Sequence, residues 1–290
     1  MTKFKKKLTS QEFATGRCPT WCPGCGDNAI WAALRSALAA LNQPPEKVVV
    51  VYGIGCSGNM ANFIRSYGFH GLHGRAVPVA EAVKIANPEL TVIVVGGDGD
   101  GLGEGLNHFI HSVRGNHDIT YLLLDNRVYG LTTGQTSPTS AKGFISKSTP
   151  AGSIEVPINP LALAISAGGT FVARGFAGEL PHLTNLIMDA VTHRGFSFID
   201  ILQPCVTFNH MNTYEGYYKN LEKLDPSNHQ EADLMKAFEK AQVADKLPIG
   251  VFYRNPRPAY HEEIMPKVDK PRALEELAVR PIDDLIAEFR

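Results

Sequence analysis

The chain has 290 residues, of which 44% are hydrophobic, so it can bury a full core in one large domain or in one domain with an appendage. Its formal net charge of -1 removes the general electrostatic argument for a nucleic-acid partner. The sequence shows neither a membrane-spanning apolar run nor a secretory signal at its start. A cytoplasmic protein without structural disulfides is therefore expected.

Apolar strands alternate with helices from residue 27 onward. A helix is expected from Asp27, which could cap it, to about Leu41. Apolar, β-branched runs then predict buried strands, and the stretches between them predict helices. The strands are expected at 47–55, 90–97, 118–126, 169–175 and 196–202, and the helices at 78–87, 102–114, 160–167 and 181–194. This alternation predicts an α/β fold with a parallel sheet covered by helices on both faces.

Two segments depart from the alternation. The stretch from Asn126 to about Asn159 is polar and rich in Gly, Ser, Thr and Pro, and loops of this length are usually functional or disordered. Because it follows a strand end, where open α/β sheets bind ligands, a functional loop is expected. After Cys205 the pattern loosens. We expect residues 1–215 to form the main α/β domain and 216–290 to form a helical extension that contacts a partner.

A glycine-rich turn with two acidic residues follows the predicted strand at 90–97. The stretch GGDGDGLGEGL opens a helix, which suits a diphosphate, but no register fits the dinucleotide-binding pattern. Asp98 and Asp100 would repel a bare diphosphate unless a divalent cation lay between them, and Mg²⁺ binds carboxylates together with phosphates. Asn126, at the end of the next strand, could add its amide oxygen. The turn therefore predicts a site for Mg²⁺ and a diphosphate.

Three of the five cysteines lie within the stretch CPTWCPGC, at Cys18, Cys22 and Cys25. The order of WCPGC differs from that of thioredoxin-like redox sites, and no strand precedes it. A zinc site usually has two closely spaced ligand pairs, whereas Cys56 and Cys205 are isolated. Both isolated cysteines follow predicted strands at the edge that carries the diphosphate turn, so four thiolates there favour an iron–sulfur cluster. Structural zinc, disulfide exchange and buried apolar cysteines are the alternatives.

Six stretches of the sequence, in order, resemble the β subunit of the 2-oxoacid:ferredoxin oxidoreductases: WCPGCG, GIGCSG, FHGLHGR, GGDGDGLG, DNRVYGLTTGQTSPT and QPCVTFN. The resemblance covers nearly the whole chain up to about residue 215, and 2-oxoglutarate-type members are the most similar. It implies the thiamine-diphosphate-binding fold, in its transketolase-like, diphosphate-binding half. It also implies that one 4Fe-4S cluster is held by Cys22, Cys25, Cys56 and Cys205, which leaves Cys18 without a role.

The resemblance implies further ligand sites. Mg²⁺ would be held by Asp98, Asn126 and the carbonyl of Val128. The residues implied to contact thiamine diphosphate are Ile54, Gly55, Cys56, Ser57, His73, Gly97, Asp98, Gly99, Asp100 and Gly130. The pocket for the substrate would be lined by Asn59, His73 and Leu131. Further candidates to bind a second substrate carboxylate are Arg65, His70 and Arg75.

The implied reaction is the oxidative decarboxylation of a 2-oxoacid, most closely 2-oxoglutarate, to an acyl-coenzyme A, with electrons passing through the cluster to ferredoxin. The reaction could also run in reverse. The activating glutamate of similar enzymes belongs to the pyrimidine-binding half, so a partner α subunit is expected, in a heterotetramer of two α and two β chains. The alternatives are a pyruvate or broad-specificity enzyme, a decarboxylase with structural zinc, and a non-catalytic iron–sulfur carrier.

Overall fold

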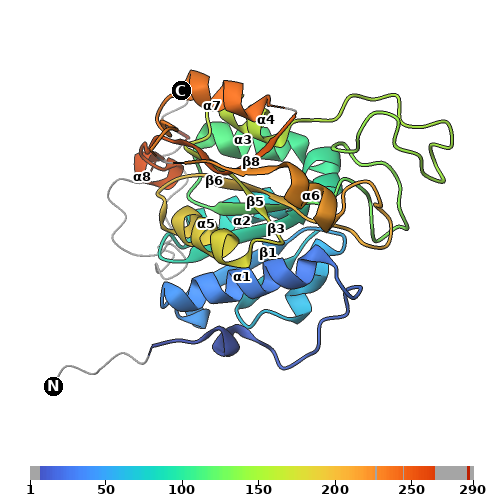
Figure 1. The fold of residues 1–290 in the computed structure, drawn as a ribbon. Helices are drawn as coiled ribbons and strands as arrows, with labels where there is room; N and C mark the ends of the chain where they lie inside the picture. The colour runs from blue at the N-terminus through green and yellow to red at the C-terminus, as the bar shows by residue number, and fades with distance from the viewer. Residues whose placement is uncertain (1–6, 226, 244, 265–285, 288–290) are drawn as a thin grey trace.

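The structure is a computed structural model that describes residues 7–225, 227–243, 245–264 and 286–287. Eight strands in these residues form one sheet with the order β2-β1-β3-β4-β6-β5-β8-β7. The strands from β2 to β5 in this order are parallel, whereas β8 is antiparallel to β5 and parallel to β7. Figure 1 shows the sheet between two layers of helices. The predicted α/β fold with a largely parallel, doubly covered sheet is confirmed.

The elements have the following bounds. The strands are β1 Val48–Tyr52, β2 Tyr67–His70, β3 Thr91–Gly97, β4 Thr120–Asp125, β5 Phe171–Phe176, β6 Ser197–Leu202, β7 Leu221–Lys223 and β8 Leu247–Arg254. The α-helices are α1 Gly26–Ala40, α2 Ala76–Ala86, α3 Leu106–Gly115, α4 Pro160–Ser166, α5 Leu180–Thr192, α6 Tyr214–Asn220, α7 Leu234–Ala241 and α8 Tyr260–Ile264. A π-helical segment spans Gly99–Glu104. None of the described helices combines the length and the apolar character that a bilayer crossing requires.

Alternate residues of the buried strands pack against opposite helix layers. In β1, Val48 and Val50 belong to the core under α1 and α5, whereas Val49 and Val51 belong to the core under α2, α3, α4 and α7 (Figure 1). All five residues of β1 are buried, as expected for a parallel strand with both faces covered. Each fully buried Val or Leu side chain contributes about 1.5–3 kcal/mol, so these two cores hold the strand ends in place.

The predicted strands and helices up to residue 202 are present, with boundaries that differ by a few residues. The expectation that Asp27 caps α1 is wrong, because Cys25 occupies the N-cap position and Asp27 lies in the first turn. The predicted helix at 102–114 is divided into the π-helical segment and α3. β2 was not predicted from the sequence, because its four residues are all exposed and show no alternation.

The C-terminal part differs from the expected helical extension. Its described residues include α7 and α8, but also β7 and β8, and β8 joins the central sheet beside β5. Residues 226, 244, 265–285 and 288–290 of this predicted extension lie outside the described residues. Its role as a partner-contacting arm stays a prediction.

The long polar segment lies between β4 and α4, as the sequence predicted. Figure 1 shows it extending away from the helix layers on the side of α6. It ends at Asn159, whose side chain accepts a hydrogen bond from Ala162 N at 3.2 Å and so caps α4. The segment therefore begins at the carboxyl end of β4 and carries polar side chains beside the loops described next.

Candidate active site

Four loops that carry predicted site residues meet at one edge of the sheet. They follow β1, β3, β4 and β6, which are adjacent parallel strands, so their carboxyl ends lie together. Two cavities lie among these loops, one of about 560 Å³ and one of about 90 Å³. The sheet topology thus creates a single region in which residues from distant parts of the chain can act together.

The larger cavity is lined by four cysteines. Cys22 and Cys25 precede α1, whereas Cys56 follows β1 and Cys205 follows β6. Burial raises the pKa of Cys56 to about 12. Asp27, Cys205 and Cys22 add to this shift, so these thiols are close enough to interact electrostatically. All five cysteines of the chain are free thiols.

Two side chains of the cysteine-rich N-terminal stretch fix the loop that carries Cys56. The indole nitrogen of Trp21 donates to the Cys56 carbonyl at 2.8 Å, and its ring packs edge-on against Phe63 with centroids 5.0 Å apart. The Thr20 hydroxyl accepts a hydrogen bond from Asn59 Nδ2 at 2.8 Å. The stretch before α1 is thereby attached to the turn after β1.

A buried polar contact also joins this stretch to the end of β6. The Gln203 amide donates to Cys25 Sγ and to Asp27 Oδ2, each at 3.3 Å, and the Cys25 thiol donates to Asp27 Oδ2 at 3.3 Å. Burial raises the pKa of Asp27 to about 7, although the hydrogen bond from Cys25 lowers it. Asp27 and Gln203 are almost fully buried, so each depends on the other as a partner.

The smaller cavity lies against the turns after β1 and β3. It is much smaller than the roughly 300–1,000 Å³ of a typical small-molecule site, so a bound coenzyme must extend beyond it. The residues that line both cavities are Ile54, Gly55, Cys56, Asn126, Gly130, Leu131 and Gln203. The cysteine cavity and the smaller cavity therefore adjoin.

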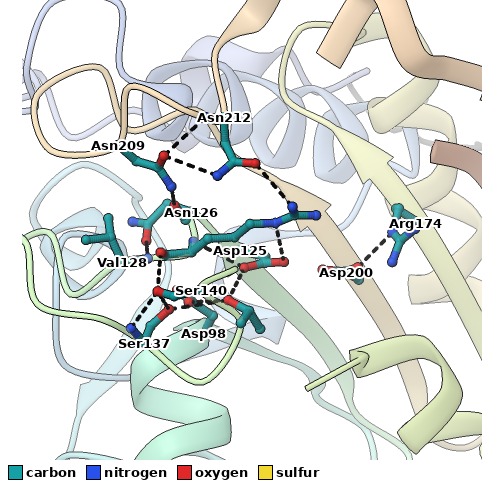
Figure 2. A network of polar contacts seen from close by, with 12 residues as sticks. Asp98, Asp125, Asn126, Val128, Ser137, Ser140, Arg174, Asp200, Asn209 and Asn212 are labelled. Carbon is teal, nitrogen blue, oxygen red and sulfur yellow. Dashed lines mark hydrogen bonds and ion pairs between the residues drawn. The ribbon is translucent and has the colours of Figure 1, made fainter. Parts of the chain in front are cut away.

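A hydroxyl group connects two buried carboxyl groups beside the smaller cavity. Thr139 Oγ1 lies 2.6 Å from Asp98 Oδ2 and 2.7 Å from Asp125 Oδ1. Figure 2 shows the polar network around these two carboxyl groups, including Ser137 and Ser140 of the long loop. The loop after β4 thus folds back over the turn after β3 and holds Asp98 in one orientation.

The side-chain amide of Asn126 stabilises the turn at the end of β4. Its Oδ1 accepts from Val128 N at 3.0 Å, while its carbonyl accepts from Asn209 Nδ2 at 2.9 Å (Figure 2). Asn209 N donates to Cys205 O at 3.0 Å, and Asn209 Oδ1 accepts from the Asn212 backbone and side chain, each at 3.1 Å. Asn209 therefore joins the loop that carries Asn126 to the loop that carries Cys205.

Buried acidic groups outnumber buried basic groups in the described part of this network. Arg174 Nε pairs with Asp200 Oδ2 at 2.8 Å, and Arg127 Nε lies 3.8 Å from Asp125 Oδ2 (Figure 2). Asp98 is the third buried carboxyl group. Burial, and then Asp200 and Asp98, raise the pKa of Asp125 to about 8. A divalent cation at Asp98 would favour the ionised form of this carboxyl group beside its buried acidic neighbours.

Asp100 connects three turns. Its Oδ1 accepts hydrogen bonds from Ile54 N at 2.9 Å and from Gly74 N at 2.7 Å. His73 Nδ1 lies 3.3 Å from the same oxygen, without the geometry of a hydrogen bond. Asp100 lines the smaller cavity as predicted, but this oxygen holds the protein's own backbone.

The donor atoms present fit the expected cofactors. Ser57 Oγ and His73 Nδ1 are buried at the smaller cavity without a hydrogen-bond partner in the described part of the chain, and a diphosphate would satisfy such atoms. Within the described ranges no three His, Cys, Asp or Glu side chains are arranged as a formed metal site. The Mg²⁺ donor set of Asp98, Asn126 and the Val128 carbonyl contains only one carboxylate, and hard oxygen donors suit Mg²⁺.

The cysteine cavity fits an iron–sulfur cluster by its donor set and space. Four thiols line one cavity of about 560 Å³, and soft thiolates favour iron–sulfur clusters or zinc. A Cβ atom at Gly130 would lie 3.6 Å from Cys56 Sγ and 3.7 Å from Cys205 Sγ. Glycine at this position therefore leaves room beside two of the four sulfurs.

Every residue predicted to bind the cluster, Mg²⁺ or thiamine diphosphate, or to line the substrate pocket, lines one of the two cavities. The larger one contains Cys22, Cys25, Cys56, Asn59, Leu131 and Cys205, and the smaller one contains Ile54, Gly55, Ser57, His73, Gly97, Asp98, Gly99, Asp100, Asn126, Val128 and Gly130. Among the further substrate candidates, His70 lines the larger cavity, while Arg65 lies outside both linings. The Arg75 guanidinium donates to the carbonyls of His73 and Glu104. Cys18 is exposed and lies outside both cavities.

Five residues that hold the candidate ligand groups in place are absent from the sequence-based predictions of the site, namely Asp27, Asp125, Thr139, Gln203 and Asn209. Gln203 and Asn209 flank Cys205 in the stretch QPCVTFN, so their position was a usable signal. Thr139 lies in the long polar loop, and no sequence pattern distinguishes it from the neighbouring hydroxyl residues.

Known proteins resemble this chain along most of its length. Residues 53–201 match the family "Thiamine pyrophosphate enzyme, C-terminal TPP binding domain", and residues 205–269 match the C-terminal family of the pyruvate ferredoxin oxidoreductase beta subunit. The 2-oxoacid:ferredoxin oxidoreductase subunit beta of Sulfolobus sp is 46% identical over 270 residues, which are 88% of each chain. The chain belongs to this β-subunit family.

Other β subunits of 2-oxoacid:ferredoxin oxidoreductases and their relatives agree with this assignment. The 2-oxoglutarate synthase subunit KorB of Archaeoglobus fulgidus is 35% identical over 260 residues, covering 89% of this chain and 92% of the relative. A solved 2-oxoglutarate:ferredoxin oxidoreductase from Magnetococcus marinus, with 2-oxoglutarate, coenzyme A and succinyl-CoA bound, has a TM-score of 0.91. It is 36% identical and covers 99% of this chain and 98% of its own.

Membership of the 2-oxoacid:ferredoxin oxidoreductase β subunits confirms three predictions. The chain is a subunit of a thiamine-diphosphate-dependent enzyme, it has the thiamine-diphosphate-binding fold, and as a β subunit it has an α subunit as its partner. The alternative of a non-catalytic iron–sulfur carrier is thereby excluded.

Proposed function

We propose that this β subunit serves an enzyme that converts 2-oxoglutarate and coenzyme A into succinyl-CoA and CO₂, while two electrons pass to ferredoxin. The observation that supports this reaction best is the pair of adjoining cavities. One is lined by four thiols and the other by the Asp98 and Asn126 turns, and seven residues line both. An electron acceptor and a carbon–carbon bond-cleaving coenzyme would then be neighbours.

The smaller cavity is proposed to hold Mg²⁺ and the diphosphate end of thiamine diphosphate. Asp98, Asn126 and the Val128 carbonyl would hold the ion, and Ser57 and His73 would hydrogen-bond the diphosphate. When bound, the coenzyme supplies the nucleophilic carbon and the electron sink for loss of CO₂. Thr139 keeps the Asp98 carboxyl oriented, since its hydroxyl lies 2.6 Å from Asp98 Oδ2.

The larger cavity is proposed to hold a 4Fe-4S cluster on Cys22, Cys25, Cys56 and Cys205. Such a cluster supplies a one-electron acceptor. Trp21 covers the Cys56 loop and anchors it by a hydrogen bond of 2.8 Å to the Cys56 carbonyl. Structural zinc on the same four thiols is the competing metal, and the metal analysis below distinguishes them.

The choice of 2-oxoglutarate over pyruvate rests on relatives. The solved enzyme from Magnetococcus marinus binds 2-oxoglutarate and matches 99% of this chain. Two subunits named for 2-oxoglutarate, from Archaeoglobus fulgidus and Methanocaldococcus jannaschii, are 35% and 32% identical. Within the chain, His70 lies at the larger cavity and is the best-placed basic side chain for a second carboxylate. Asn59 and Leu131 are proposed to line the same substrate pocket.

The experiment is an assay of the chain co-expressed with its α subunit and purified without oxygen. We expect about four irons and four sulfides per β chain, no stoichiometric zinc, and coenzyme A-dependent reduction of ferredoxin. The kcat/KM for 2-oxoglutarate should exceed that for pyruvate at least about tenfold, since a site built to pair a second carboxylate rejects the substrate that lacks it. An α₂β₂ assembly is expected by light scattering.

The outcomes separate the parts of this proposal. Equal or better activity with pyruvate would overturn the substrate assignment alone. A colourless complex with zinc in place of iron would overturn the cluster, and activity without added thiamine diphosphate and Mg²⁺ after dialysis against a chelator would contradict the proposed coenzyme site.

A further inference from the structure

Gln203 lies where the two cavities adjoin. It follows the last residue of β6, it lines both cavities, and only 1% of its surface is exposed. Its backbone amide donates to the Asp125 carbonyl at 3.0 Å, which continues the pairing of β6 with β4. Its side chain therefore starts from a rigid position and must find partners for its amide inside the protein.

The side-chain amide of Gln203 faces two acceptors. Its nitrogen lies 3.3 Å from Cys25 Sγ and 3.3 Å from Asp27 Oδ2, so its two hydrogens can serve both. The reversed amide would place its oxygen against a sulfur and a carboxylate oxygen, which is unfavourable. The chemistry of the neighbours thus fixes the amide as a donor to the sulfur.

The backbone around this contact is also fixed. Gly26 N donates to Pro204 O at 3.1 Å, which ties the first turn of α1 to the residue after Gln203. A Cβ atom at Gly26 would lie 2.7 Å from Gln203 Cγ, so only glycine permits this close approach. The distance between Gln203 and Cys25 is therefore set by the packing of α1 against the end of β6.

We propose that Gln203 is a positioning residue that donates a hydrogen bond to the Cys25 sulfur and thereby raises the reduction potential of the cluster. This inference rests on the proposed function, in which Cys25 is a cluster ligand. A donor to a ligand sulfur stabilises the extra negative charge of the reduced cluster more than that of the oxidised one. Gln203 also lines the smaller cavity, where the coenzyme is proposed to bind. Its hydrogen bond therefore acts on the side of the cluster that receives electrons from the coenzyme.

The test measures the cluster's midpoint potential in the complete α–β complex by titration followed by electron paramagnetic resonance. Gln203→Met keeps an unbranched side chain of similar length without a donor. We expect its equilibrium constant for taking up one electron to fall about tenfold, a shift of about 59 mV to lower potential. The matched control is Gln43→Met. In the wild type, the Gln43 amide oxygen accepts from Thr91 Oγ1 near the opposite end of β3, so this change should leave the potential unchanged.

A second measurement covers the case in which Gln203→Met does not retain the cluster. The wild-type complex, labelled with ¹⁵N at the glutamine side chains, should show a ¹⁵N hyperfine coupling to the reduced cluster, and Gln43→Met should retain it. An unchanged potential in Gln203→Met with full iron and sulfide content, or no ¹⁵N coupling in the wild type, would overturn the role of Gln203 and leave the proposed function intact. Wild-type complex without iron would overturn the proposed function itself.

Discussion

Thr139 has one hydroxyl hydrogen, but it lies within hydrogen-bonding distance of two buried carboxyl groups. Its oxygen is 2.6 Å from Asp98 and 2.7 Å from Asp125. One of these contacts therefore needs a hydrogen from a carboxyl group. Burial raises the pKa of both Asp98 and Asp125. A Mg²⁺ ion at Asp98 would favour its ionised form, so we expect Asp125 to be the donor and Thr139 to donate to Asp98.

Thr139→Val tests this arrangement. Valine has the same shape without the hydroxyl, so two buried carboxyl groups lose their bridge. We expect the free energy of unfolding to fall by about 1–3 kcal/mol and the affinity for Mg²⁺ and thiamine diphosphate to fall about 10–100-fold. Calorimetric titration and urea unfolding measure both. Thr184→Val, which removes only a hydroxyl bonded to Leu180 O on the exposed side of α5, is the matched control, and equal effects of the two changes would contradict this role.

His193 predicts a pH dependence of stability. Burial, followed by the nearby Arg254, lowers its pKa from 6.5 to about 4. Between these values the unfolded chain binds more protons than the folded chain, so stability is full above pH 6.5 and is lost as the pH falls toward 4. Because His193 is only partly buried, we take half of the ideal effect, about 1 kcal/mol at pH 5.

His193→Gln removes the titrating group. The variant should therefore lose about 1 kcal/mol less stability than the wild type when the pH is lowered from 7.5 to 5. Urea unfolding at the two pH values measures this difference. Equal losses in both proteins would show that His193 does not carry the acid sensitivity.

The sequence predicted that the candidate ligand residues would lie at one edge of the sheet, whereas the contacts that support them could not be predicted. Asp98, Asn126, Cys56 and Cys205 each follow a recognisable apolar strand, and parallel strands bring their carboxyl ends together. The contact between Asn209 and Asn126 joins residues in irregular loops, where no periodicity indicates which side chains meet.

At the scale of elements, the π-helical segment Gly99–Glu104 depends on closely packed glycines. A Cβ atom at Gly99 would overlap the Tyr129 ring, and one at Gly101 would overlap the hydroxyl of Tyr121. Tyr121 is buried and packs between Phe109 and Phe198, with ring centroids 5.9 and 5.8 Å away. The segment that follows Asp98 thus lies directly on the core, which fixes the turn.

Gly101→Ala should destabilise the protein by about 1–3 kcal/mol, because the added methyl group meets a side chain that cannot move away. Thermal unfolding measures the change. Gly71→Ala is the control, since its Cβ would lie at an ordinary 3.6 Å from Phe69. Adding Tyr121→Phe to Gly101→Ala should recover part of the loss, and no recovery would place the strain elsewhere.

Strands could be predicted where their burial produces a recognisable apolar pattern in the sequence. β1, β4 and β6 are fully buried and read as apolar runs. β2 is exposed along its whole length, and β8 lies after a segment that looks irregular, so their membership of the sheet depends on pairing with β1 and β5 rather than on local sequence. The π-helical form of the 99–104 segment likewise follows from packing against the tyrosines.

At the scale of the whole molecule, we expect this β subunit to hold one side of a site that it shares with the α subunit. The smaller cavity measures only about 90 Å³, and Leu131, which lines it, is 60% exposed. We therefore expect the isolated chain to bind thiamine diphosphate weakly and to show no 2-oxoacid-dependent viologen reduction, because the activating glutamate is expected on the α subunit. Adding purified α subunit should restore turnover. Substantial activity of the isolated chain would contradict the shared site.

The position of β8 also affects how the polypeptide is made. β5 pairs with β6 on one side and with β8 on the other, but β8 is the last strand in the described chain order. At a synthesis rate of about 5–20 residues per second, β5 therefore leaves the ribosome several seconds before β8, the strand that pairs with its second edge. An unpaired strand edge attracts other chains, so ribosome-bound intermediates of this protein are natural clients for chaperones, and cutting the gene after codon 215 would make that exposed edge permanent.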